Sequence, residues 1–390
     1  MTEQSDKTID TKASRATLRG RPMLYTEYAR DQALLNTPAK RVWTLILVAL
    51  VIAAPFLPFV TRSQQSDLTL VFILAIGGIG LNLVTGYAGQ VSLGHAFFVG
   101  LGAFTAAALG GTSTQNVVGY ELDLLLWLPA AGLVAAAVGF VLAPLAARVR
   151  GLYLAILTLG LVFIGEHLFK ELQFISGGLG VGRRGPDPTI FGFGLFQPQE
   201  ILGVQFDRET PFYLFTFLLL VLMGVLARNL ARSRMGRAFA AVRDRDIAAE
   251  VMGVPLLKTK TIAFTVSSFY AGVCGGLLSV SFGQITPENF GGLGGLLLSV
   301  EFLAIILIGG VATISGSIIG AAFVVLMPRL VQNYAGDIPF IGDGTFLSVQ
   351  QLEGILFGVL IVLFLILEPR GLFGLWLRVR NYWKAWPFSY

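Results

Sequence analysis

Charged residues are scarce in this chain of 390 residues, of which Asp, Glu, Lys and Arg make up only 13%. An ordinary soluble domain carries roughly 25% charged residues, so this share argues against a compact water-soluble globule. The same composition excludes a disordered or fibrous chain, because 55% of the residues are hydrophobic and the mean hydropathy is +0.74. The sequence therefore indicates a protein that lies in a lipid bilayer.

Cysteine and histidine are also nearly absent. The single cysteine, Cys274, cannot form an internal disulfide, and the two histidines, His95 and His167, cannot alone complete a usual metal site. The sequence contains no GxxxxGK[ST] phosphate-binding loop, so we expect no nucleotide site of its own. We therefore expect no catalytic residue, no metal site and no cofactor bound by this chain.

About ten stretches are apolar and long enough to cross a bilayer, since a hydrocarbon core of about 30 Å needs about 20 apolar residues in a helix. They predict an all-α, polytopic integral membrane protein. The predicted spans are residues 42–60, 68–85, 90–110, 124–146, 152–169, 212–228, 261–281, 293–309, 316–331 and 350–367. The glycine-rich segment 176–194 is predicted to be an outer loop, because Arg183, Arg184 and Asp187 lie inside it.

Basic residues determine the expected orientation of these spans. The N-terminal segment 1–41 holds eight Lys and Arg, and the loop 228–260 holds another eight against three acidic residues. Cytoplasmic segments of membrane proteins are rich in Lys and Arg, and ten crossings from a cytoplasmic N-terminus put both segments on that side. The predicted organisation is a cytoplasmic tail over 1–41, a transmembrane domain over 42–369 and a second cytoplasmic tail over 370–390.

The polar interruption between the sixth and seventh spans is the most informative segment. Residues 237–252 have helix-forming composition, and Gly253 with Pro255 ends the helix. We expect a short helix on the cytoplasmic surface, where Ala248, Ala249 and Gly253 form a face of small residues that lets another protein approach closely. An ordinary amphipathic interfacial helix is the alternative.

Several segments together resemble a known family. GRAFAAVRDRDIAAEVMGV, followed by KTKTIAFTVSSFYAGVCGGLL, is similar to the cytoplasmic coupling loop and next helix of branched-chain amino acid ABC permeases of the LivM type. The resemblance extends to GYAGQVSLGHAFFVGLGAF, GLYLAILTLG, LAIILIGGVATISGSIIGAA and EPRGLFGL. These segments follow the family's order and cover most of residues 70–375, whereas the first 60 or so residues have no such match.

The resemblance places the coupling loop at about 233–257. In such permeases the coupling helix carries a pattern of Glu-Ala-Ala, three residues and Gly, and docks in a groove of the ATPase. Here Ile247 stands in the position of that Glu, which leaves Glu250 or Asp246 to supply an acid. The residues expected to couple to the ATPase are Gly236, Arg237, Arg243, Asp244, Ala248, Ala249 and Gly253.

The resemblance also implies partners and a location. They are a sister permease of the LivH type, two cytoplasmic ABC ATPases that use ATP and Mg, and an extracytoplasmic solute-binding protein. The chain is expected in the bacterial inner membrane with both termini cytoplasmic, and no nucleic acid is implied. The implied solutes are leucine, isoleucine and valine, with urea and short amides as the alternative.

Two glycine-rich turns between spans are candidates for the translocation path. Backbone groups freed by breaks in a membrane helix are tolerated where they line a cavity, so they are expected to contact the zwitterionic end of an amino acid. Close helix packing through small residues is the other interpretation. Together with the acidic residue of the eighth predicted span, the candidate path residues are Gly89, Ser92, His95, Glu301, Gly309, Gly310 and Ser315.

Glu301 lies near the middle of the eighth predicted span. A charge at the bilayer centre costs about 2.5–3.5 kcal/mol on insertion scales, so we expect this carboxyl to face the bundle or the path. A proton-driven secondary transporter with Glu301 as relay is an alternative function. A membrane enzyme is disfavoured, because His95 and His167 fall near opposite membrane faces in the predicted topology.

Overall fold

The computed structural model describes residues 38–57, 60–114, 117–149, 151–178, 180–197, 199–201, 204–206, 208–335, 349–368 and 370–385. Within these ranges, seven helices are long and apolar enough to cross a membrane, and three apolar helices are shorter. The long ones are α3 (Arg62–Leu81, continued by the π-helix η2 over Asn82–Tyr87), α5 (Leu124–Arg148), α6 (Leu152–Glu171), α8 (Thr210–Arg232), α11 (Leu256–Phe282), α13 (Gly292–Gly309) and α14 (Ile314–Ala335). The shorter ones lie within α2 (Pro38–Ala53, continued by η1 over Ala54–Phe56), α4 (His95–Gly110) and α15 (Val349–Leu367).

Each of the ten predicted spans coincides with one of these ten helices, so the all-α polytopic class is confirmed. Of the two predicted tails, residues 1–37 and 386–390 lie outside the described residues. The C-terminal one contains a further helix, α16 (Gly371–Ala385), which the sequence analysis did not predict. The remaining short helices are α7 (Gln173–Ser176), α9 (Arg234–Asp244), α10 (Asp246–Val251) and α12 (Pro287–Phe290).

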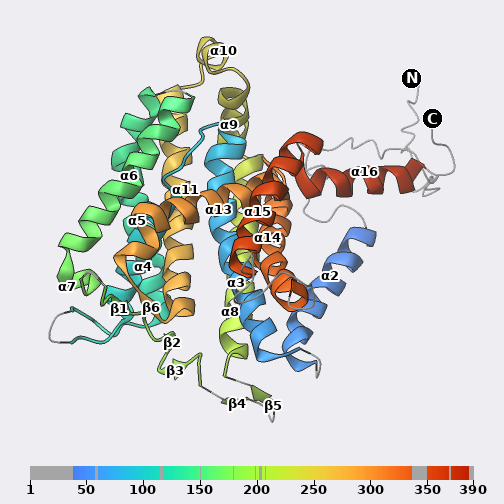
Figure 1. Ribbon diagram of the computed structural model, residues 1–390. Helices are drawn as coiled ribbons and strands as arrows, with labels where there is room; N and C mark the ends of the chain where they lie inside the picture. The colour runs from blue at the N-terminus through green and yellow to red at the C-terminus, as the bar shows by residue number, and fades with distance from the viewer. Residues whose placement is uncertain are drawn as a thin grey trace, which may run out of the picture.

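Three small antiparallel sheets, also not predicted, lie at the opposite end of the molecule from α10 (Figure 1). They pair β1 (Arg183–Arg184) with β6 (Gln284–Ile285), β2 (Thr189–Ile190) with β3 (Phe193–Gly194), and β4 (Gln199–Ile201) with β5 (Val204–Phe206). The outer loop 176–194 is therefore partly ordered by strand pairing.

Helices α3 and α11 form the centre of the bundle. In their apolar stretches, 83% and 78% of the residues are buried, compared with 33% in α6. Lipid tails are as apolar as leucine, so membrane helices associate mainly by close packing of small residues. A Cβ at Gly102 of α4 would overlap the backbone of Gly272 of α11, and one at Gly275 would overlap the carbonyl of Val99. These glycines let α4 and α11 meet backbone to backbone.

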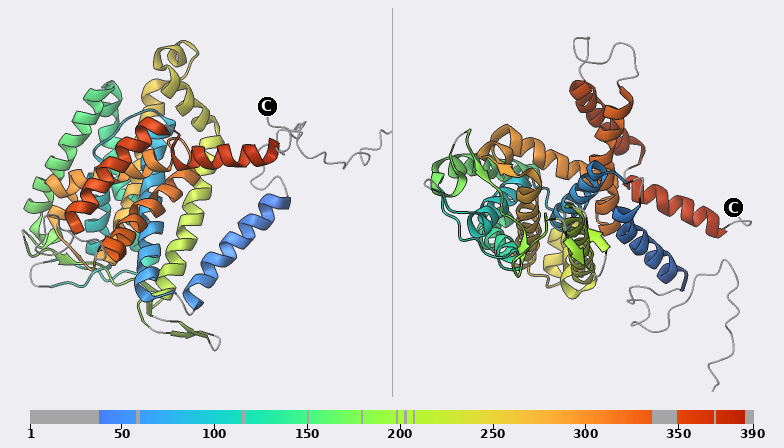
Figure 2. Two further views of the ribbon diagram at one scale, coloured as in Figure 1. Left: turned by 45° about the vertical axis from the view of Figure 1, so that its right-hand side comes forward. Right: turned by 90° about the horizontal axis from the view of Figure 1, so that it is seen from below.

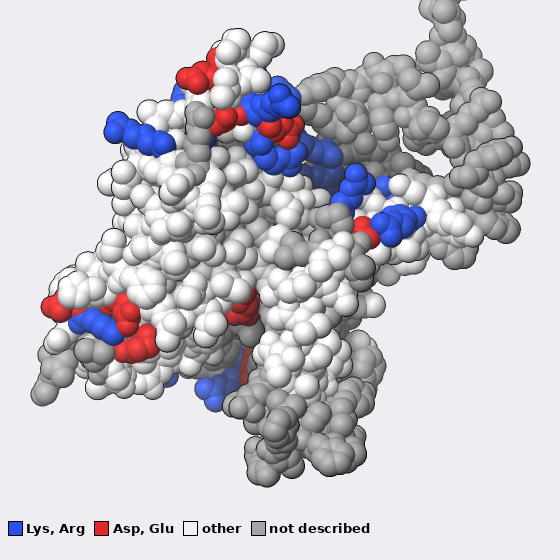
Figure 3. Space-filling view, turned by 45° about the horizontal axis from the view of Figure 1, so that its top comes forward, with Lys and Arg blue, Asp and Glu red and all other residues white. Residues whose placement is uncertain are grey.

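Charge is concentrated at the two ends of the molecule. Figure 3 shows Lys and Arg, with a few acids, gathered at the end that carries α9 and α10, and a second charged group near the opposite end. The surface between them is largely uncharged, as the side of a membrane protein should be. Seen from below, α2, α15 and α16 project away from the other helices (Figure 2).

A buried arginine holds the outer loops together. The guanidinium of Arg183 donates from Nη1 to the carbonyls of Val118 (3.1 Å) and Ile175 (2.8 Å) and from Nη2 to that of Ala107. Burial lowers the pKa of Arg183 to about 10, so the group stays protonated at neutral pH. The sequence analysis treated this residue only as a charge that excludes a span, whereas it cross-links three segments.

Replacing Arg183 with Met should therefore destabilise the outer end. The substitution leaves three carbonyls without their donor, and we expect a loss of about 2 kcal/mol or more in the free energy of unfolding. The matched control is Arg184→Met, because Arg184 is 78% exposed and its ion pair is with the exposed Asp187; such a pair contributes about 0–1 kcal/mol. Thermal unfolding in detergent measures both, and equal midpoints for the two variants would contradict this role.

Candidate coupling site at the cytoplasmic end

The predicted surface helix is two helices, α9 and α10, joined at Arg245. Ser233 caps α9, since its hydroxyl accepts from the N–H groups of Met235 (3.1 Å) and Gly236 (3.4 Å). Arg245 is extended, with φ −157° and ψ 104°, and the Asp246 carboxylate then accepts from the N–H of Ile247 (2.9 Å). Acidic side chains that bond to nearby backbone compete with helix continuation, so the prediction of one unbroken helix was wrong.

Helix α9 is anchored to the bundle by its inner face, where Phe239 and Val242 are buried. Gly236 is also buried, and a Cβ there would overlap the backbone of Ala231. Gly236 therefore permits the tight turn between α8 and α9 and does not present a surface to a partner. Arg237, by contrast, is exposed.

The outward surface of α10 and of the residue that follows it carries three large apolar side chains beside the exposed Glu250. Ile247, Val251 and Met252 are 64%, 82% and 83% exposed, whereas Ala249 is buried. Ala248 and Gly253 are exposed, and Gly253 adopts φ +86°, which suits glycine. The expected face of small residues is thus divided between the interior and the surface, and the sequence analysis missed the larger exposed apolar side chains.

The junction of α9 and α10 borders a cavity of about 600 Å³. One wall comes from residues 242–248 and Lys260, and another from Gly89, Gln90 and Gly151. The first predicted glycine-rich turn therefore lies against the coupling segment. Two groups of residues predicted for separate roles meet at one site.

Arg243 makes the contact between them. Its Nη1 donates to the carbonyl of Gly86 (3.2 Å), and its Nε donates to Oδ1 of Asp244 (3.2 Å). Gly89 adopts φ +68°, and a Cβ there would lie 2.8 Å from Cγ and 3.0 Å from Cα of Arg243. Only glycine fits this turn without displacing the arginine.

Asn82, in the π-helix η2, carries the contact further into the bundle. Its Nδ2 donates to Thr313 O (2.9 Å), Ser317 Oγ (2.8 Å) and, at 3.4 Å, Gly310 O, while its Oδ1 accepts from Ala312 N (2.8 Å). π-Helical turns are rare and often occur at functional sites. Asn82 is fully buried, and the sequence analysis missed it because only ionisable residues inside the spans were considered.

The Asn82 network comprises Arg243, Gly86, Asn82, Ala312, Thr313 and Ser317. Ala312 has φ +58°, a conformation that costs a non-glycine residue about 1 kcal/mol or more. Its N–H bond to Asn82 helps to hold it there. A Cβ at Gly86 would overlap Oδ1 of Asn82 and lie 2.6 Å from the N of Ala312. The network thus connects α9, η2 and the turn between α13 and α14 through direct contacts.

The second predicted turn packs helices together. A Cβ at Gly309 would overlap the carbonyl of Gly316, so these glycines bring α13 against α14, and Gly310 adopts φ +135°. Ser315 is exposed beside this turn, and Glu301 lies partly buried on α13. The contact of Gly309 with Gly316 is therefore close helix packing through small residues, the second of the two interpretations of this turn.

The start of α4 is buried, and several of its polar groups have hydrogen-bond partners. Ser92 accepts from the N–H of Gly94 (3.4 Å), and Nε2 of His95 is 3.0 Å from the carbonyl of Gly77. The N–H of Leu93 donates to the Thr158 hydroxyl (2.9 Å), and that of Ala96 donates to the Ser299 hydroxyl (3.1 Å). Breaks inside a membrane need such partners, so these residues are structural supports of a short span.

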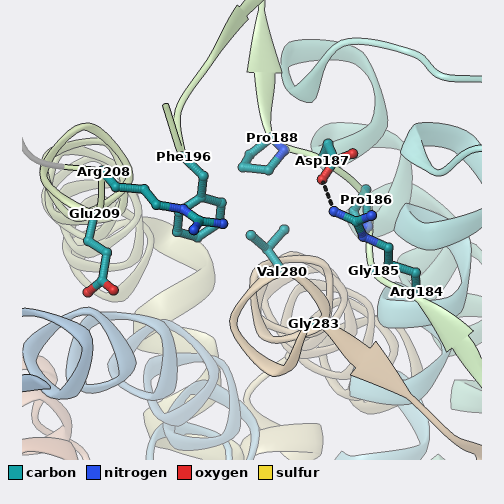
Figure 4. A pocket seen from close by; sticks show the side chains of 10 residues that line it. All are labelled: Arg184, Gly185, Pro186, Asp187, Pro188, Phe196, Arg208, Glu209, Val280 and Gly283. Carbon is teal, nitrogen blue, oxygen red and sulfur yellow. Dashed lines mark hydrogen bonds and ion pairs between the residues drawn. The ribbon is translucent and has the colours of Figure 1, made fainter. Parts of the chain in front are cut away.

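A smaller cavity of about 250 Å³ opens at the outer end (Figure 4). Arg208 extends into it beside Phe196, and the ion pair of Arg184 with Asp187 (3.2 Å) lies on the opposite side. Val280 of α11 forms part of the apolar wall. The cavity thus combines charged and apolar groups, and the sequence analysis did not predict it.

Comparison with known proteins identifies the family. Residues 66–365 match the family model described as branched-chain amino acid transport system, permease component. The chain is 32% identical over 349 residues to the high-affinity branched-chain amino acid transport permease LivM of Escherichia coli, and 31% identical to that of Salmonella typhimurium. Each match covers 86% of this chain and 76% of the relative.

The branched-chain permease BraD of Pseudomonas aeruginosa is 25% identical over 79% of this chain and 94% of its own. No solved structure matches the fold. The family match covers well over half of the chain. The ten apolar helices among the described residues of this chain agree with a multi-pass membrane protein. The chain belongs to the permease family of branched-chain amino acid transport systems.

Proposed function

We propose that this chain is the permease subunit of an ABC importer for leucine, isoleucine and valine. One observation carries the proposal: in a chain of this family, an exposed apolar tip on α10 is connected to the transmembrane helices through the Asn82 network. The tip suits a protein partner, because exposed apolar side chains on a short cytoplasmic projection bury area on docking. The chain would supply the translocation path and the coupling helix, and its partner subunits would hydrolyse ATP.

The proposed partners are a sister permease of the LivH type, two cytoplasmic ABC ATPases that use ATP and Mg, and an extracytoplasmic solute-binding protein. Both termini would be cytoplasmic in the bacterial inner membrane. The named relatives are branched-chain amino acid permeases, which favours these solutes over urea or short amides. A proton-driven carrier is less well supported, because relays use chains of acids and Glu301 is the one acidic residue in the sequence of its predicted span, 293–309.

The proposed mechanism is alternating access. Closure of the ATPase dimer moves α10, and the junction at Arg245 makes α9 follow. Arg243 carries the displacement to Gly86, and Asn82 carries it to the turn between α13 and α14. These contacts transmit the movement only if α9, Asn82 and the turn between α13 and α14 move as one body. Coupling between two sites requires a structural element whose equilibrium both sites shift.

The proposed function is tested by uptake into vesicles that contain the chain with its partner subunits and a matching binding protein. We expect ATP-dependent uptake of labelled leucine that is lost when the ATPase is omitted, and no uptake of labelled urea. Uptake that persists without ATPase but collapses with the proton gradient would overturn the proposal in favour of a secondary transporter.

Val251→Asp tests the docking surface. Val251 is exposed, so the substitution should leave folding unchanged while placing a charge in the ATPase contact. We expect at least a tenfold loss of leucine uptake and of stimulated ATPase activity, with normal membrane insertion. The control is Val181→Asp, the same substitution at an exposed residue of the loop 176–194. Ala249 is unsuitable because it is buried. Full uptake by Val251→Asp would rule out α10 as the docking element.

Gly89→Ala tests the contact with Arg243, and Gly151→Ala is its matched control. Both glycines line the same cavity at positive φ, +68° and +60°, and Gly151 also has ψ −132°, a region that strains alanine by about 1–3 kcal/mol, so backbone strain alone should not spare the control. Only at Gly89 would the new Cβ meet Arg243, since nothing lies within 4 Å of the corresponding position at Gly151. We expect Gly89→Ala to retain ATP hydrolysis while leucine uptake falls about tenfold. Equal uptake by the two variants would argue against transmission through this contact.

A further inference from the structure

Helix α16 lies outside the bundle (Figure 1). It runs across the direction of the long helices in Figure 1 and extends outward in both views of Figure 2. Its height is fixed by contacts with the end of α13: a Cβ at Gly371 would lie 2.6 Å from the carbonyl oxygen of Ile308, and one at Gly310 would lie 3.0 Å from that of Arg370.

The ion pair of Arg378 with the buried Glu368, at 2.8 Å, ties α16 back to the end of α15. The helix therefore leaves the bundle at the level of the turn between α13 and α14. This turn belongs to the Asn82 network and so lies toward the α9 end of the molecule. By the positive-inside rule, that end faces the cytoplasm.

One face of α16 is apolar and uncovered. Leu375, Trp376, Val379 and Tyr382 are 36%, 57%, 50% and 59% exposed. Their spacing of one, three and three residues places them on the same side of a helix. Trp and Tyr are the side chains enriched where a bilayer meets water, because each has an apolar body and a polar group.

The charge of this segment has one sign. Between residues 370 and 385 there are four basic residues, Arg370, Arg378, Arg380 and Lys384, and no acidic residue. Arg370 and Arg380 are exposed. A helix with basic residues and an exposed apolar face that runs across the direction of the spanning helices matches the pattern of interfacial helices that bind anionic lipid.

We propose that α16 is an interfacial helix that binds the headgroups of anionic phospholipids in the cytoplasmic leaflet. Its apolar face enters the outermost hydrocarbon, and Arg370 and Arg380 contact lipid phosphates.

The depth of α16 is tested with the full chain in nanodiscs of phosphatidylcholine and phosphatidylglycerol. Fluorescent labels are attached to Trp376→Cys and, separately, to Arg380→Cys. The native Cys274 is buried and should not react. We expect lipids with a nitroxide high on the acyl chain to quench the label at 376 strongly, and aqueous iodide to reach the label at 380 better. Quenching by iodide at 376 as strong as for a label at the exposed outer residue Val181 would overturn the proposal.

The charge requirement is tested by comparing nitroxide-labelled phosphatidylglycerol with nitroxide-labelled phosphatidylcholine as quenchers of the label at 376. We expect a preference for phosphatidylglycerol that falls roughly fivefold for each of Arg370→Gln and Arg380→Gln. Arg184→Gln, at the outer end, should not change it. An unchanged preference in the double variant would overturn the proposal. A label that is shielded from both lipid and iodide once the sister permease is added would also overturn it, because that result indicates a protein interface. None of these readouts depends on transport, so they are independent of the proposed function.

Discussion

The four hydrogen bonds of Asn82 are the interaction on which the half of this protein that carries α9 and α10 depends. A backbone that leaves its helix inside a membrane needs partners for its freed N–H and carbonyl groups, because lipid offers none. Asn82 supplies both a donor and an acceptor to the turn between α13 and α14. Gly86, one turn later, leaves room for that amide and offers its carbonyl to Arg243.

The two ends of the molecule are built differently. At the outer end, Arg183 and three small sheets join the loops through buried or paired backbone groups. At the opposite end, α10 projects with apolar side chains exposed and is joined to α9 by a single extended residue. A well-supported outer end and a projecting inner end suit a subunit that receives force from one side. Helix α16 adds a contact with the membrane surface at the level where that force would arrive.

Much of the fold could be predicted from the sequence, because long apolar stretches and the placement of basic residues report directly on spanning helices. All ten predicted spans coincide with helices of the structure, and a helical polar segment between the sixth and seventh spans was expected from its charge and composition. The break at Arg245 could not be predicted, since helix-forming composition says little about where one carboxylate competes with the helix. The strands of the outer loop are too short to leave a period-two pattern.

The site was only partly predictable for a related reason. Gly89 and Arg243 were selected for separate roles, and only the folded chain reveals that they touch. Asn82, Thr158 and Ser299 are uncharged polar residues within apolar spans, and attention to any polar group that needs a partner in lipid would have found them. Tertiary contacts over more than two hundred residues, such as Asn82 with Ala312, leave no local trace in one sequence.

The central claim is that α10 and the turn between α13 and α14 move together. It is tested most directly by spin-label distances in the assembled transporter, from Leu152→Cys on α6 to Ile247→Cys and, in a second sample, to Ser315→Cys. All three sites are exposed. The account predicts that trapping the ATPases in their ATP-bound form changes both distances. A change in the distance to 247 with none in the distance to 315 would contradict it.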